Sequence, residues 1–508
     1  MQGSVFSTER SFRIDIRGAV ALEKSRRPYR ATYAVLALAV GGYALLQSLV
    51  IPVLPTIQAG LHTSQNSVTW VLTAYLLSAA IFTPIMGRLG DMHGKERLLV
   101  VTLVALTFGS LLAAVASSMP LMIVARVIQG VGGGVLPLSF GLIRDEFPKE
   151  KVIGAIGVIA ALAAAGAGLG IVLAGPIVNA LDYHWLFWIP MIVMAFGVVA
   201  AHYVVPESEV RTAGTISWAG VLLLSAWLVA LILGISEAPT WGWASTSVIG
   251  LLIGAVVLAV VWVVVEARSA HPLIDMNMMR IPAVWTTNLV ALLLGVGMYA
   301  VFAFLPEFLQ THSSAGYGFG VSITKSGLIL LPMSIFMFAF GMLSGRLSKR
   351  FGSKSVLVTG LLIGIFAYAL LTFAHTAQWE ILLAMVILGV GFGLSFASMS
   401  TLVVIAVPPE QTGVASGMNA NVRTIGGSIG AAVMSSIVTS GVRAGSVPRE
   451  SGYTHGFGLL TIAAIAATIA AFFAPGRLRA PTAVTEATMP HAELGMVAAG
   501  TLAGDESE

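Results

Sequence analysis

The sequence predicts an all-α integral membrane protein, in which two six-helix bundles are joined by two inserted helices to give 14 transmembrane helices. Composition is the first reason, because 57% of the 508 residues are hydrophobic and 10% are charged, with a mean hydropathy of +0.91. Soluble domains average about 45–50% apolar and about 25% charged residues. The other two reasons are a basic turn that occurs twice and the sorting of Lys and Arg among the loops.

Fourteen apolar stretches are long enough to cross a bilayer, which takes about 20 helical residues. They cover residues 31–56, 67–87, 98–117, 119–142, 151–176, 184–205, 216–236, 246–266, 283–310, 322–344, 353–374, 378–405, 412–439 and 455–474. The polar segment 1–30 precedes them. The Ala- and Thr-rich segment 476–508 follows them, and it lacks any packing pattern, so we expect it to be disordered.

The repeated turn indicates how the stretches are grouped. The first copy joins the second and third stretches, and the second copy joins the tenth and eleventh. If each copy joins the second and third helices of a six-helix half, the second half begins with stretch nine. Stretches seven and eight are then an insertion between the halves. We therefore expect a cytoplasmic tail over 1–30, a bundle over 31–205, two inserted helices with linkers over 206–282, a second bundle over 283–475, and a cytoplasmic tail over 476–508.

The basic residues of the loops alternate as the positive-inside rule requires. Opposite loops hold only Arg443 and Arg449, both in the last one. The loops assigned to the cytoplasm hold Arg88, Lys95, Arg97, Arg144, Lys149, Lys151, Arg211, Arg268, Arg280, Arg346, Lys349, Arg350 and Lys354. We therefore expect a multi-pass protein of the inner, or plasma, membrane with both termini in the cytoplasm.

The two copies of the basic turn are GRLGDMHGKER at Gly87–Arg97 and GRLSKRFGSK at Gly345–Lys354. A turn that only fixed topology would need neither an Asp nor glycines at fixed places. We therefore interpret the turn as a gate in a transporter built from two related halves. The alternative is a basic turn that sets topology alone.

Asp91 is the residue of the gate that most needs partners, because its charge lies at the membrane edge among Arg88, Lys95 and Arg97. We expect Asp145, at the end of the fourth stretch, to join by pairing with Arg88 or Arg97. The candidate gating residues are Gly87, Arg88, Asp91, Gly94, Lys95, Arg97, Asp145, Gly345 and Arg346.

Four polar residues within the apolar stretches are candidates for proton coupling. An ionisable side chain at a helix centre costs about 2.5–3.5 kcal/mol on insertion scales, so each one indicates pairing or function. Arg126 precedes Gln129 by one turn, and Arg423 lies too deep to reach the surface easily. Glu307 follows Pro306 within a core-bundle stretch, where a desolvated carboxyl could exchange protons near neutrality. The alternatives are that Arg126 reaches the outer surface and that Glu307 reaches the outer water.

Close helix packing is predicted in the fifth stretch, where Gly166, Gly170 and Gly175 recur at about helical spacing. Small residues at such positions let two helix backbones approach each other. Pro176 follows directly and is expected to bend or end the helix.

Several kinds of chemistry find no support in the sequence. There is no cysteine, the nine histidines have no metal-ligand spacing, and GxxxxGK[ST] does not occur. We expect no metal, no cofactor and no enzymatic activity. The net charge of +4 is explained by loop sorting, so it does not indicate nucleic-acid binding.

These motifs resemble those of the major facilitator superfamily, specifically its fourteen-helix drug:proton antiporters. The first basic turn is similar to the superfamily's signature between helices 2 and 3 at Gly87, Leu89, Asp91, Gly94, Lys95 and Arg97. The fourth stretch resembles the helix-4 signature at Arg126, Gln129 and Gly130. The fifth resembles the antiporter signature at Gly166, Gly170 and Gly175. The resemblance implies the major facilitator fold, a cytoplasmic gate at the Asp–Arg turn, proton transfer involving Arg126, and export favoured by the glycine-rich helix.

The sequence departs from this family in two places. Many relatives carry an Asp in helix 1, where this chain has Leu46 or Gln47. The prolines expected beside the first two glycines of the fifth stretch are replaced by Ala167 and Ile171. The coupling carboxylate must therefore lie outside helix 1.

The sequence favours a secondary exporter that uses the proton gradient to move amphipathic drug-like compounds or self-made metabolites out of a bacterium. Its partners would be a small-molecule substrate, protons and the lipid bilayer, and we expect a monomer. One alternative is an importer or facilitator of small solutes, which the scarcity of polar residues in the spans disfavours. The others are a lipid exporter of the same fold and a membrane receptor that transports nothing, although a duplicated gate argues against a receptor.

Overall fold

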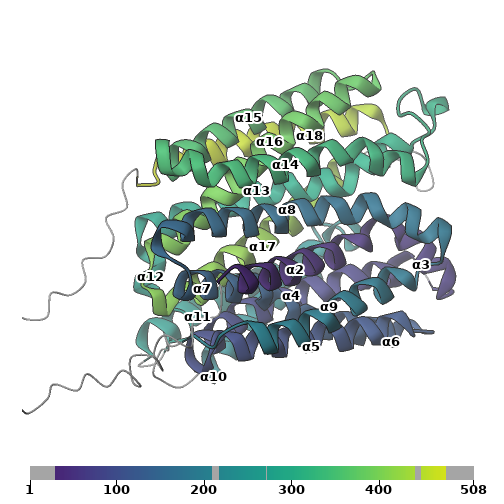
Figure 1. The fold of residues 1–508 in the computed structure, drawn as a ribbon. Coiled ribbons are helices and arrows are strands. Elements are labelled where there is room, and N and C mark those ends of the chain that lie inside the picture. Colours follow the sequence, from purple (N-terminus) through teal and green to yellow (C-terminus); the bar gives the residue numbers. More distant parts are fainter. Residues whose placement is uncertain (1–28, 64, 209–216, 270–271, 441–447, 476–508) are drawn as a thin grey trace, which may run out of the picture.

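The computed structural model describes residues 29–63, 65–208, 217–269, 272–440 and 448–475, and every regular element in these ranges is helical. The expected tail over 476–508 and nearly all of segment 1–30 lie outside these ranges. Figure 1 shows the long helices running side by side. The first group consists of α2 (Tyr29–Leu49), η1 (Ile51–Val53), α3 (Leu54–Gly60), α4 (Gln65–His93), α5 (Lys95–Ala114), α6 (Met119–Gly130), η2 (Val131–Gly134), α7 (Val135–Glu146), α8 (Lys149–Ala180) and α9 (Trp185–Val204).

The remaining elements form the inserted pair and a second group. The inserted pair consists of α10 (Trp218–Trp241) and α11 (Thr246–Arg268), followed by the short α12 (Met276–Arg280). The second group consists of α13 (Pro282–Gln310), η3 (Ser313–Ala315), α14 (Ile323–Phe351), α15 (Ser353–Phe373), α16 (Gln378–Ala406), η4 (Pro409–Gln411), α17 (Thr412–Val438) and α18 (Glu450–Phe472).

The number of apolar spans differs from the prediction. Thirteen helical segments of the described ranges are long and apolar enough to cross a membrane. The thirteenth predicted span, 412–439, forms α17, a helix of 27 residues that is not among these thirteen segments. Asn419, Asn421 and Arg423 lower its hydropathy, and α17 packs against α13, α4 and α10. Thirteen of the fourteen predicted spans thus correspond to apolar helical segments, and the remaining one is the more polar helix α17.

Two predicted spans contain breaks where the residue types disfavour a regular α-helix. In the first, α2 passes into η1 and α3, and Pro52 removes a backbone donor at that point. In the fourth, α6 and α7 are joined by the 3₁₀ turn η2, which reads VGGG. Glycine lowers helix propensity by about 1 kcal/mol relative to alanine, so this run is a favourable place for the change.

Of the two effects expected of Pro176, bending or ending its helix, the second does not occur. Helix α8 continues through Pro176 to Ala180. The proline lies in the last two turns, and its side chain is exposed at the helix surface.

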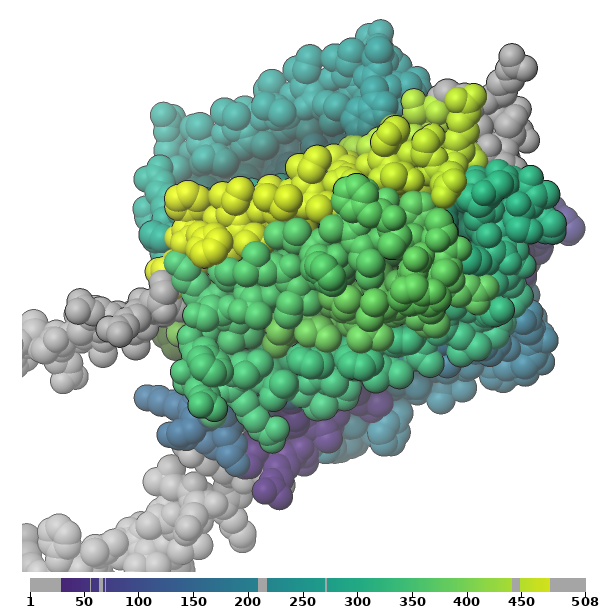
Figure 2. All heavy atoms as spheres, turned by 90° about the horizontal axis from the view of Figure 1, so that it is seen from above, coloured from purple at the N-terminus to yellow at the C-terminus, as the bar shows by residue number. Residues whose placement is uncertain are grey.

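The two groups of helices meet along two seams. Helix α8 packs along α14 at one seam, and α4 packs along α17 at the other. Helix α10 contacts both α4 and α17, so the inserted pair covers the second seam. The pair forms the teal layer along one edge of the molecule in Figure 2. Helices of each group also contact the other group. The predicted domain boundaries, after residue 205 and after residue 282, therefore stay predictions.

The described chain begins and ends on the same side of the bundle. Lys151 Nζ, just after the turn between α7 and α8, donates to Tyr29 Oη at 2.5 Å. Lys354 Nζ, in the second basic turn, donates to the carbonyl of Phe472 at the end of α18 at 2.7 Å. Lys349 of that turn also donates to the carbonyl of Glu150, so both ends lie near the same loops. This arrangement is the one that an even number of crossings requires.

Candidate functional site: a buried gate and a central cavity

The first basic turn forms a buried cluster of charges. Gly94 separates α4 from α5 with a φ of 111°, which favours glycine. Lys95 begins α5, and its Nζ lies 2.7 Å from Asp145 Oδ2 and 3.4 Å from Asp91 Oδ1. The side chains of Lys95 and Asp91 are fully buried. Ser208 Oγ also donates to Asp145 Oδ2, at 2.5 Å. The cluster thus joins the ends of α4 and α7 to the start of α5.

The cluster also holds the two groups of helices together. Asp91 Oδ2 accepts a hydrogen bond of 3.2 Å from the backbone N–H of Val414, in the first turn of α17. The first N–H groups of a helix have no partner within the helix, and its N-terminus favours negative charge. A Cβ on Gly87 would lie 2.5 Å from the carbonyl oxygen of Gly413. Only glycine therefore fits this contact between α4 and α17.

Arg144 adds a second link across the same seam. Its Nη1 donates to Thr412 Oγ1 at 2.9 Å and also to the backbone carbonyl of Val404. It joins the end of α7 to α16 and α17. Sequence reasoning placed Arg144 among the loop cations and missed this role, which depends on where the second group of helices lies.

The expected partners of Asp145 were wrong. Asp145 pairs with Lys95 instead of Arg88 or Arg97. The Arg97 side chain is 70% exposed, and its Nε lies 3.4 Å from Glu207 Oε2. Lys95 is the first residue of α5, and its side chain points into the protein toward the end of α7. The side chain of Arg97, two residues later, points toward solvent.

Arg88 faces the inserted pair. It interacts electrostatically with Glu266 near the end of α11. Glu266 is 1% exposed and accepts a hydrogen bond of 3.2 Å from the N–H of Ile274. The first basic turn and the linker that follows the inserted pair are therefore neighbours.

The second basic turn is built differently. Gly345 is buried, and a Cβ there would lie 2.9 Å from the Cα of Gly154 on α8. Arg346 is exposed. Lys349 and Ser353 occupy the positions that Asp91 and Lys95 hold in the first copy. The structure therefore brings Asp91, Lys95 and Asp145 into one network and leaves Arg346 apart from it.

Arg126 and Gln129 form a polar cluster inside the first group. Arg126 is fully buried, with Nε donating to the carbonyl of Val71 at 2.8 Å and Nη1 to Gln129 Oε1 at 2.7 Å. Gln129 Nε2 donates to Ser110 Oγ at 3.0 Å. The guanidinium lies 4.3 Å from the centre of the Tyr75 ring. Arg126 thus points inward and does not reach the outer surface.

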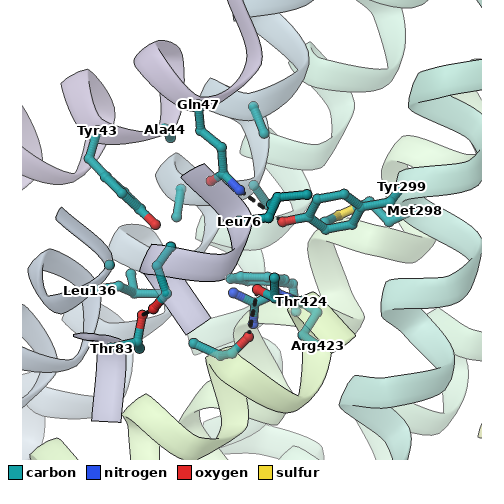
Figure 3. Close-up of a pocket in the computed structure, with 17 residues that line it drawn as sticks. Tyr43, Ala44, Gln47, Leu76, Thr83, Leu136, Met298, Tyr299, Arg423 and Thr424 are labelled. Atoms are coloured by element: carbon teal, nitrogen blue, oxygen red, sulfur yellow. Dashed lines mark hydrogen bonds between the residues drawn. The ribbon is translucent and has the colours of Figure 1, made fainter. Parts of the chain in front are cut away.

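A cavity of about 50 Å³ lies between the two groups. Gln47 of α2 and Tyr299 of α13 point toward each other across it, and Gln47 Nε2 donates to the Tyr299 hydroxyl at 2.9 Å (Figure 3). Arg423 of α17 lines it from the second group, 4.4 Å from the centre of the Phe396 ring. Of the two helix-1 candidates, Leu46 is fully buried and Gln47 faces the cavity.

Glu307 lies apart from this cavity. It belongs to the last turn of α13, and its side chain is exposed. It does not line the cavity, so among the four proton-coupling candidates only Arg423 does. Sequence reasoning missed Tyr43, Tyr75 and Tyr299, because an uncharged tyrosine in an apolar stretch gives no signal.

The glycines of α8 serve both groups. A Cβ on Gly166 would lie 2.8 Å from the Cβ of Ala44, and one on Gly170 would lie 2.9 Å from the carbonyl of Leu45, both on α2. A Cβ on Gly175 would lie 2.9 Å from Thr324 Oγ1 on α14. The predicted close packing is therefore present, and Gly175 extends it across the seam.

Two groups of membrane-spanning helices around a central cavity, with a buried charge cluster at one end of their interface, are features of a transporter of small molecules. The chain belongs to the Major Facilitator Superfamily, whose sequence profile matches residues 36–234 and 208–431. It is therefore a multi-pass secondary transporter and not an enzyme.

Similar curated proteins include several named for drug resistance. The chain is 30% identical to the multidrug resistance protein B homolog of Mycobacterium tuberculosis, covering 76% of this chain and 71% of that protein. It is 28% identical to the multidrug transporter protein MdtP of Bacillus subtilis (74% and 69%). It is also 28% identical to the tetracenomycin C resistance and export protein of Streptomyces glaucescens (82% and 77%).

A solved structure has the same fold. The crystal structure of the human organic anion transporter MFSD10 matches with a TM-score of 0.64 and 16% identity. The match covers 87% of this chain and 99% of that one. At this identity the likeness establishes the fold alone.

Proposed function

We propose that this protein is a proton-driven exporter of amphipathic drug-like compounds or metabolites, of the fourteen-helix drug:proton antiporter type. It would lie in the cell membrane with the basic turns in the cytoplasm. Its relatives named for multidrug resistance and for tetracenomycin C export support the substrate class and the direction. The buried gate supports alternating access, in which two bundles rock about a central site.

The main support for the proposal is that Asp91 contacts both groups of helices. Its carboxylate faces Lys95 in its own group and the N–H of Val414 in the other. A charged acceptor makes both interactions strong, and a neutral side chain weakens them. A change in the charge of this cluster would therefore shift the balance between states closed and open at this end. Arg126, Gln129, Arg423 and Glu307 are the proposed proton-coupling residues.

Asp91→Asn tests the gate. Loss of hydrogen bonds to a charged group costs about 1.5–3 kcal/mol each, so we expect transport of a dye panel into inverted vesicles to fall about tenfold or more. Membrane insertion should be unchanged. Asp182→Asn is the matched control, because Asp182 is exposed in the loop between α8 and α9. A normal rate in Asp91→Asn would reduce the turn to a topology signal.

A further inference from the structure

The most unusual group in the central cavity is the Arg423 guanidinium. Arg423 is only 9% exposed, lines the cavity, and lies over Phe396. Among the residues that the structure describes, no side chain forms a salt bridge or a hydrogen bond with this guanidinium. Buried charges in proteins are normally paired, because removing an ion from water is costly. An aromatic face compensates only part of that cost.

The other residues that line the cavity supply no negative charge. Within the described ranges its lining contains no Asp or Glu. The nearest carboxylate along α4 is that of Asp91. At 1.5 Å per residue it lies about 12 Å further along the helix than Thr83, which lines the cavity. Asp91 also forms an ion pair with Lys95. Apart from Arg423, the lining side chains are neutral, and those that can form hydrogen bonds include Tyr43, Gln47 and Tyr299.

A second guanidinium reinforces the positive character of this region. Arg126 stacks on Tyr75, which lies close enough to Tyr43 and Tyr299 of the cavity to interact electrostatically with both. Its Nη2 is buried without a hydrogen-bond partner. Arg126 contacts a carbonyl, an amide and a ring, and within the described part of the chain no acidic side chain forms an ion pair with it.

We infer that the central cavity recognises substrates that carry an anionic group on an aromatic or apolar body, with Arg423 as the counter-ion. This inference rests on the proposed export function and specifies its substrate class. The carboxylate, sulfonate or phenolate of a substrate would supply the charge that the cavity lacks. Tyr43, Tyr299 and Phe396 would contact the aromatic body, whose faces and edges suit such rings.

The size of the cavity indicates when binding occurs. Drug-sized ligands occupy pockets of about 300–1,000 Å³, whereas this cavity measures about 50 Å³. The substrate would therefore enter a more open state, in which the two groups separate and Gln47 leaves Tyr299. Arg423 would line the more open site as well, because it lies in the middle of α17, which contributes to the wall of the cavity.

The test measures binding to the purified full-length protein in lipid nanodiscs by equilibrium dialysis. The probes are 2-naphthoate, 2-naphthamide and 2-naphthylmethylammonium, which share a body and differ in charge. We expect the anion to bind at least tenfold more tightly than the amide, and the cation most weakly. Arg423→Gln should reduce binding of the anion to the level of the amide, and Arg423→Lys should keep part of the preference. Arg449→Gln, which removes an exposed cation before α18, is the control.

Several results would overturn the inference. They are equal binding of anion and amide by the wild type, tighter binding of the cation, no saturable binding of any probe, or an unchanged preference in Arg423→Gln. Because binding needs no gradient, the assay is independent of the proposed coupling. A charge preference without proton-driven transport would contradict the proposed function and leave the anion site standing.

Discussion

Lys95 Nζ lies 2.7 Å from Asp145 Oδ2, and both side chains are almost completely removed from solvent. The pair connects the start of α5 to the end of α7, beside the turn that Gly94 makes possible. Asp91 completes the cluster and reaches across to α17. The stability of the first group and the closure of the seam between α4 and α17 therefore depend on the same three charges.

Replacing Lys95 should lower stability strongly. Removing one partner of a buried ion pair costs about 3–5 kcal/mol, because the other charge stays buried without compensation. We expect Lys95→Met to lower the melting temperature of the detergent-solubilised protein, measured by the fluorescence of its tryptophans. Arg97→Met is the control, since the Arg97 side chain is 70% exposed and its pair with Glu207 contributes little. Equal melting temperatures for the two variants would contradict the role given to Lys95.

The contact between Gly87 and Gly413 should control closure of the seam. A methyl group on Gly87 would lie 2.5 Å from a backbone oxygen, so α4 and α17 must separate in Gly87→Ala. The chain has no cysteine, so Ser416→Cys places a single reactive thiol on α17 at a position that is 5% exposed. We expect Gly87→Ala to increase the rate of labelling of this thiol by maleimide several-fold.

Gly364→Ala is the matched control for that measurement. Gly364 also lies within a helix, and a Cβ there would meet nothing within 4 Å. In the Ser416→Cys background, Gly364→Ala should leave the labelling rate equal to that of Ser416→Cys alone. If Gly87→Ala behaved like Gly364→Ala, the seam would be closed by other contacts.

Much of this arrangement could be predicted from the sequence, and the failures have physical causes. The first basic turn is a local motif with charges and glycines at fixed spacing, so the sequence could indicate that its charges are paired. The partner of Asp145 could not be predicted. Lys95 and Arg97 are both basic and lie two residues apart, and only the orientation of the first turn of α5 decides which of them faces Asp145. The meeting of Gln47, Tyr299 and Arg423 joins three helices far apart in the chain. No local pattern contains that information.

The polar helix α17 shows a related limit. Its length was predicted well, since residues 412–439 were expected and Thr412–Val438 is observed. Its low hydropathy reflects its place between α13, α4 and α10, where Asn419 donates to Asn288 Oδ1 at 2.9 Å. A helix surrounded by other helices can carry polar residues that a lipid-facing helix cannot.

Topology gives a further prediction. Because the described chain begins and ends near the same loops, reporter fusions after Ser208 and after Arg477 should both report the cytoplasm. A fusion after Leu181, in the turn between α8 and α9, should report the opposite side. A periplasmic signal from either of the first two fusions would contradict the predicted topology.

Glu307→Gln tests the carboxylate proposed for coupling. Its exposed side chain at the end of α13, opposite the basic turns, suits proton uptake from the outer side while the gate is closed. We expect this variant to retain substrate binding and to lose the dependence of transport on the proton gradient. Glu237→Gln, in the inserted pair, is the control. Unchanged proton-driven transport would move the coupling role to Asp91 and Asp145, or to Arg126.

The most direct test of the account is proton-driven transport by the wild-type protein in inverted membrane vesicles. A dye panel containing anionic and cationic fluorophores is offered with and without an imposed acid-inside gradient. We expect dye to accumulate only with the gradient, anionic dyes to be preferred, and a protonophore to abolish accumulation. Accumulation at the same rate without a gradient, or no difference from vesicles lacking the protein, would contradict it.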